Sequence, residues 1–167
     1  DLHTAYRRQR QMCIRDSSTQ KRLKGDPEVA LAMAGGAPLN AVKDITGLTL
    51  DAKASATLRD LLARGRSLTP DSIVRGYSAS MGIPAVALYL SRWCYDLLRV
   101  KSGAEPHFFI REKDVLEKIA ADATMKNLLS LNAAVAEMRR SAEHPLAPRQ
   151  VWEGVLLVYV RALGGQV

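Results

Sequence analysis

"IPAVALYLSRWCYDLLRVKSG", residues 83–103, is the stretch that decides the fold. Its large apolar side chains recur at alternating spacings of four and three residues, at Val86, Leu90, Trp93, Leu97 and Val100. That spacing places them on one side of an α-helix. The most apolar part, "IPAVALYLS", is about half of the roughly 18 residues that a membrane span requires. We therefore expect a buried helix and no membrane segment.

Helical patterns also precede and follow this stretch. Residues 49–65 carry apolar side chains at helical spacing and end at Gly65, and Thr69 followed by Pro70 predicts the start of a short helix. Residues 113–142 predict a short helix and then a longer one, separated from the first stretch by a polar loop at 102–112. A further helix is expected from Pro148, with an apolar ridge at Trp152, Leu156, Tyr159 and Leu163. Because no segment alternates with period two, we predict an all-α helical bundle with five or six helices after residue 47.

Residues 26–47 predict two shorter helices. Asp26 is a suitable N-cap, Pro27 suits the first helical position, and Gly35 and Gly36 can end that helix in a left-handed conformation. The second short helix is expected to open at Pro38.

The first residues of the chain hold most of its charge surplus. Residues 1–24 contain seven Lys or Arg against two acidic residues, which leaves 17 basic and 15 acidic side chains in the other 143 residues (24 − 7 and 17 − 2). The segment "QMCIRDS" resembles one reading frame of the transposase mosaic-end adaptor used in sequencing libraries. We interpret residues 1–17 as an adaptor-derived artefact, expect them to be disordered, and leave them out of the fold. A basic nucleic-acid-binding arm is the alternative interpretation.

The sequence contains no recognisable catalytic or cofactor-binding motif. It has no phosphate-binding glycine loop, no HExxH and no paired CxxC, and its three histidines lie far apart. Cys94, beside Trp93 in the strongest helix, is interpreted as a small core residue, because nothing nearby in the sequence would activate a thiol. We therefore expect neither an enzyme nor a metal or cofactor site, and we expect a reduced, cytoplasmic protein.

Three segments together resemble one family. "AGGAPLNAV" at 34–42, "LSRWCYDLLRVKSGAEPHFF" at 90–109 and "AEHPLAPRQVWEGVLLVY" at 142–159 occur in the order and at the spacing seen in delta-prime subunits of bacterial DNA polymerase III. The resemblance covers about residues 26–163 and is greatest to proteobacterial members. Ala147 departs from the pattern, since the family usually has a capping Asn there.

The resemblance implies both an architecture and a role. Delta-prime is the non-hydrolysing subunit of the five-subunit clamp loader, an AAA+ machine held together by a helical collar. By this resemblance, residues 18–46 are the end of the AAA+ lid domain and 47–167 are the collar, which is the oligomerisation domain. The position of the nucleotide-sensing arginine is occupied by Leu39, which cannot bind a phosphate. The parent complex is a DNA polymerase holoenzyme that loads the sliding clamp on primed DNA.

A collar must present some apolar side chains to its neighbours. Leu88 lies off the first ridge, and Val155 and Val158 lie off the ridge that follows Pro148, so we expect some of them to be exposed and to contact other clamp-loader subunits. DNA would be contacted only indirectly, through the complex. The alternative is a helical nucleic-acid-binding or transcription-regulator bundle, although the helix at 83–101 is too apolar to lie in a major groove.

Overall fold

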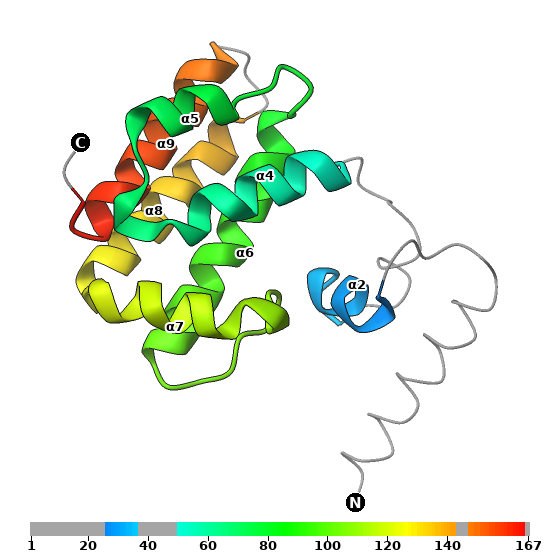
Figure 1. Cartoon of the computed structure of the whole chain (residues 1–167), viewed down its shortest axis with the longest axis vertical. Helices are drawn as coiled ribbons and strands as arrows, with labels where there is room; N and C mark the ends of the chain where they lie inside the picture. The colour runs from blue at the N-terminus through cyan, green and yellow to red at the C-terminus, as the bar shows by residue number, and fades with distance from the viewer. Residues whose placement is uncertain (1–25, 37–49, 143–146, 166–167) are drawn as a thin grey trace, which may run out of the picture.

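The computed structural model describes residues 26–36, 50–142 and 147–165, and within these ranges it is entirely helical (Figure 1). The predicted all-α bundle is therefore confirmed for the described part of the chain. The predicted short helix at 37–47 and the predicted artefact at 1–17 lie outside the described residues, and the division into lid and collar stays a prediction.

Six α-helices follow residue 47 in the described ranges, as expected from the sequence. One short helix, α2, precedes them. The bounds are α2 Pro27–Met33, α4 Ala52–Ala63, α5 Pro70–Gly76, α6 Ile83–Lys101, α7 Lys113–Asp122, α8 Met125–Ser141 and α9 Pro148–Ala162, with 3-10 turns η1 at Gly65–Ser67 and η2 at Ile110–Glu112.

Local capping explains where several helices begin. Asp26 accepts a hydrogen bond from the Glu28 N–H at 2.9 Å, and Thr69 accepts one from the Ser72 N–H at 3.3 Å, so both predicted N-caps are confirmed. Asp51 caps α4 in the same way, through the Ala54 N–H at 2.7 Å. Each bond satisfies one of the backbone donors that a helix start leaves without a partner.

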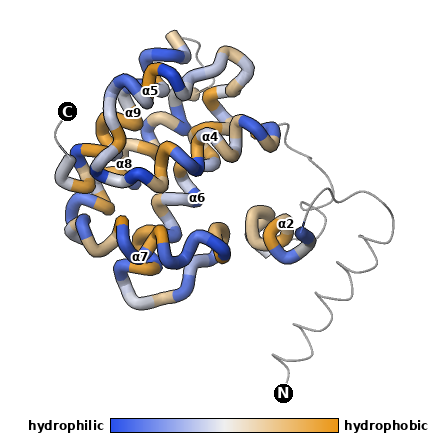
Figure 2. The backbone as a smooth tube through the Cα atoms, viewed as in Figure 1, coloured by the Kyte–Doolittle hydropathy of each residue, from blue (hydrophilic) through white to orange (hydrophobic). Residues whose placement is uncertain are grey.

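Helix α6 is the centre of the bundle. It packs mainly against α7 and α8, while α8 packs against α9, and α5 lies against α4 and α9 (Figure 1). Figure 2 shows hydrophobic and hydrophilic stretches alternating along α4 and α7, as expected where one side of a helix faces a core. The predicted ridges are buried except at Val100, which is partly buried near the end of α6. At most 1% is exposed at each of the other ridge residues: Val86, Leu90, Trp93, Leu97, Trp152, Leu156, Tyr159 and Leu163.

Three buried hydrogen bonds join α9 to the neighbouring helices. The Tyr159 hydroxyl on α9 donates to the Leu62 carbonyl on α4 at 2.8 Å and accepts from the Trp93 indole N–H on α6 at 3.3 Å. A single phenol thus links three helices and satisfies two buried polar groups. The Trp152 indole similarly donates to the Ile73 carbonyl at 2.9 Å, which fixes α9 against α5.

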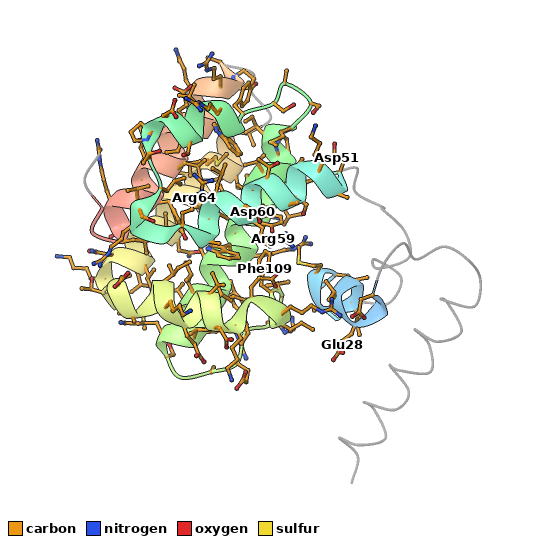
Figure 3. The ribbon with its side chains drawn as sticks, viewed as in Figure 1. Glu28, Asp51, Arg59, Asp60, Arg64 and Phe109 are labelled. Carbon is orange, nitrogen blue, oxygen red and sulfur yellow. The ribbon has the colours of Figure 1, made fainter. Side chains whose placement is uncertain are left out.

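The stretch at 102–112 is not the purely polar loop that its sequence predicts. Phe109 is 4% exposed and packs edge-on against the rings of Tyr89 and Trp93 at centroid distances of 5.0 and 4.9 Å. Figure 3 shows it in the middle of the bundle, between α4 and α7. The stretch returns into the core because its backbone is held there by a buried carboxylate, as described next.

Candidate functional site

The buried carboxylate belongs to Asp96 on α6, which is 0% exposed. Its Oδ1 accepts the His107 N–H at 2.8 Å, and its Oδ2 accepts the N–H groups of Phe108 and Phe109 at 2.8 and 2.7 Å. Three charge-assisted bonds offset the desolvation of one buried acid. They also fix the chain direction, so that Phe109 enters the core while His107 is exposed at the surface.

The side of α6 away from its buried ridge carries a different set of residues. Leu88, Arg92, Tyr95 and Arg99 follow one another at spacings of four, three and four, and we call this set the outer face of α6. Leu88 and Arg92 are half-buried, and Tyr95 is 44% exposed. Large aromatic and arginine side chains at a surface are typical of binding sites, where they supply contact area and directed hydrogen bonds.

The loop held by Asp96 adds two more rings to this face. Phe108 lies 5.6 Å from the Tyr95 ring and 4.8 Å from the His107 ring, measured between centroids, in edge-on arrangements. The Arg92 guanidinium stacks over Phe108 at 5.6 Å, and that of Arg99 over Tyr95 at 5.7 Å. Stacking orients both guanidinium planes, and the Nε–H of Arg99 also donates to the Glu105 carbonyl at 2.8 Å.

A surface hollow of about 450 Å³ opens beside this cluster. It is lined by residues of α6, by the loop that Asp96 holds at residues 107–109, by the end of α2 and by one residue of α8. The lining residues are Ala34, Gly35, Leu88, Ser91, Arg92, Tyr95, His107, Phe108 and Arg139. Gly35 has φ +67° and lies against Phe108, so a small residue brings the end of α2 close to the aromatic cluster. We call this hollow the arginine pocket.

The arginine pocket carries positive charge that no described carboxylate balances. Within the described residues, no carboxylate oxygen lies within 4.0 Å of the guanidinium of Arg92 or Arg139. The pKa of Arg92 is lowered, chiefly by its burial and further by the positive charge of Arg139. Two cations therefore share one hollow without a described counter-charge. Such an arrangement favours an anion.

The residues singled out from the sequence fall in different surroundings. Leu88 lines the arginine pocket, and Val158 is exposed at 36%. Val155 is only 7% exposed and belongs to the core, so it is not one of the exposed members of the predicted set, and the contact of that set with other subunits stays a prediction. Val155 faces inward because it directly precedes Leu156 on α9, and the buried face of that helix is wide enough to include both. Leu39 lies outside the described residues.

Cys94 is buried, as expected for a core residue, with 1% of its side chain exposed. Burial raises the pKa of its thiol to about 12, so the nucleophilic thiolate is scarce at neutral pH. Four residues of the site, Arg92, Tyr95, Asp96 and Arg139, were not predicted from the sequence. Arg92 and Tyr95 could have been found from their helical spacing to Leu88, whereas Arg139 is far away in the sequence and only the fold brings it to α6.

The described residues were also compared with the requirements of a metal site and of a membrane span. In the described ranges, histidine, cysteine and acidic side chains form no group of three or more that could hold a metal ion. None of the described helices combines the length and apolar character of a bilayer span. Comparisons with known protein families, with curated proteins and with solved structures gave no match.

Proposed function

We propose that this chain is a non-catalytic assembly subunit of a bacterial clamp loader, with residues 47–167 as its helical collar. It works without a cofactor, in the cytoplasm, and binds other clamp-loader subunits in a hetero-oligomer that loads the sliding clamp on primed DNA. The sequence resemblance to delta-prime subunits supports this role. The all-α bundle is compatible with it.

The observation that carries the proposal is the outer face of α6. A helix whose opposite side forms the core still presents Leu88, Arg92 and Tyr95 outward, and Tyr95 is 44% exposed. Exposed apolar side chains also occur on α8, at Met125 and Leu129, with exposed fractions of 37% and 55%. Surfaces of this composition are common at the centres of subunit interfaces.

Size-exclusion chromatography with light scattering tests the assembly role. The full chain is mixed with the purified ATPase and delta subunits of a proteobacterial clamp loader, and we expect it to co-elute with them. A Tyr95→Asp variant should lose co-elution, because a charge would be buried at the interface. Val74→Asp is the control, since Val74 is exposed to a similar extent, 40%, but lies on α5. Loss of co-elution in both variants, or in neither, would contradict a specific interface on α6.

The alternative, a nucleic-acid-binding bundle, is tested with the same preparation. Residues 25–167 carry a surplus of only two positive charges, 17 minus 15, so we expect weak DNA binding at about 150 mM salt. Tight binding in a mobility-shift assay, together with failure to co-elute, would favour the nucleic-acid-binding role instead.

A further inference from the structure

We propose that the arginine pocket is a binding site for a phosphate group. The inference concerns the isolated chain and goes beyond the assembly role. It rests on a hollow of about 450 Å³ that Arg92 and Arg139 both line, with aromatic side chains forming part of its wall.

The two guanidinium groups of the pocket match the charge of a phosphate group. A phosphate group carries about 1.5 to 2 negative charges at neutral pH, which two guanidinium groups can balance, and planar guanidinium forks bind its oxygens in bidentate fashion. A neutral ligand would leave the two like charges facing each other. Because the positive charge of Arg139 and the burial of Arg92 both lower the pKa of Arg92, a bound anion would also relieve an existing repulsion.

The two groups near the pocket that could repel an anion, a carboxylate and a helix C-terminus, already accept hydrogen bonds from backbone N–H groups. Asp96 is the acid closest in sequence to Tyr95, but both of its oxygens are turned inward to the N–H groups of residues 107–109. Carbonyl groups at the C-terminal end of a helix repel an anion when they lack a hydrogen-bond donor. At the end of α2, three of them accept hydrogen bonds from the N–H groups of Ala34, Gly35 and Gly36. Neither group opposes an anion in the pocket strongly.

The Arg92 guanidinium is held in position before a ligand binds. Arg92 is stacked on Phe108, and Phe108 is fixed by its backbone bond to Asp96, so the guanidinium has little freedom to lose on binding. The hydroxyl of Ser91 already donates to the Ala87 carbonyl at 2.8 Å, which leaves the donor role to the arginines and to the exposed side chains of Tyr95 and His107. The rings of Tyr95 and Phe108 can also contact an aromatic group attached to the phosphate.

The test is a titration of the ¹⁵N-labelled full chain with inorganic phosphate, followed by NMR at constant pH and ionic strength. We expect saturable shifts of the Nε–Hε signals of Arg92 and Arg139 and of the backbone amides at 107–108. The variants Arg92→Gln and Arg139→Gln should each weaken binding by about tenfold or more. Their amide spectra show whether the fold is intact.

Arg140→Gln is the matched control, because Arg140 is adjacent in sequence but forms an ion pair with Glu137 and does not line the pocket. It should bind phosphate like the unmodified chain. Shifts that grow linearly without saturating, or equal losses in the Arg139 and Arg140 variants, would overturn the proposal.

Two further ligands identify the source of the phosphate group. Tighter binding of phenyl phosphate than of inorganic phosphate, with ring-current shifts at Tyr95, would support an aromatic phosphate monoester. Equal binding would support free phosphate. Benzoate binding as tightly as phenyl phosphate would overturn selection for phosphate and indicate a carboxylate, such as an acidic side chain of a partner.

Discussion

Replacing Asp96 with Asn removes the charge of the buried carboxylate but keeps its shape. An Asn has one acceptor oxygen, which can still serve the N–H groups of Phe108 and Phe109. Its amide group then points a donor at the His107 N–H, which loses its partner. One charge-assisted bond is lost and two become neutral, so we expect a loss of about 2–4 kcal/mol in the free energy of unfolding and a fall in Tm of roughly 5–15 °C.

The assay combines urea unfolding, followed by circular dichroism, with amide hydrogen exchange. Exchange should accelerate most at residues 107–109, because the His107 amide loses its acceptor and the Phe108 and Phe109 amides keep only a neutral one, and less in α8 and α9. Asp60→Asn is the control: the Asp60 side chain is 67% exposed and, among the described residues, forms an ion pair only with the neighbouring Arg59 at 3.4 Å, so its loss should change stability by less than about 0.5 kcal/mol. If Asp96→Asn is no more destabilising than Asp60→Asn, the carboxylate does not hold the loop.

Three other substitutions, and measurements on Cys94, test separate features. Gly154→Ala should stabilise the chain by about 0.5–1 kcal/mol, since alanine favours a helix and its Cβ would lie in open space. Gly76→Ala should destabilise the chain by about 1–3 kcal/mol, because the new Cβ would lie 2.5 Å from Leu61 Cδ1. Urea unfolding measures both changes. Ala147→Gly should stabilise by about 1 kcal/mol, since Ala147 has φ +44°, and an unchanged unfolding midpoint would contradict this. Cys94 should react with a disulfide reagent only after unfolding. Because burial raises its pKa from 9.0 to about 12, its contribution to stability is complete below pH 9 and falls as pH rises toward 12, which alkaline unfolding curves can detect.

The helices could be predicted from the sequence because their signals are local. The ridges that contain Trp93 and Tyr159 follow from spacing alone, and Thr69 with Pro70 marks the start of α5 within one residue. The return of residues 107–109 into the core could not be predicted in this way. It depends on a bond between Asp96 and a backbone segment 11 to 13 residues later, and an acid in a helix is ordinarily solvated.

The candidate site was predicted only in part, for a related reason. Leu88 was identified because it lies off an apolar ridge, and the structure places it in the arginine pocket. Val155 was selected by the same logic, but the buried face of α9 is wider than a single ridge and includes it. The pairing of Arg92 with Arg139 depends on how α6 packs against α8, which sequence spacing within one helix does not encode.

The hydrogen bonds of Tyr159 have a consequence for synthesis on the ribosome. The Leu62 carbonyl and the Trp93 indole lie 97 and 66 residues before their common partner. Translation delivers α4 and α6 well before α9, so both groups lack that partner while the nascent chain grows. Until α9 emerges, the apolar surfaces that it will cover are available to chaperones and to other nascent chains. Formation of the Tyr159 hydrogen bonds therefore marks the point at which α9 has joined the bundle and the fold is complete.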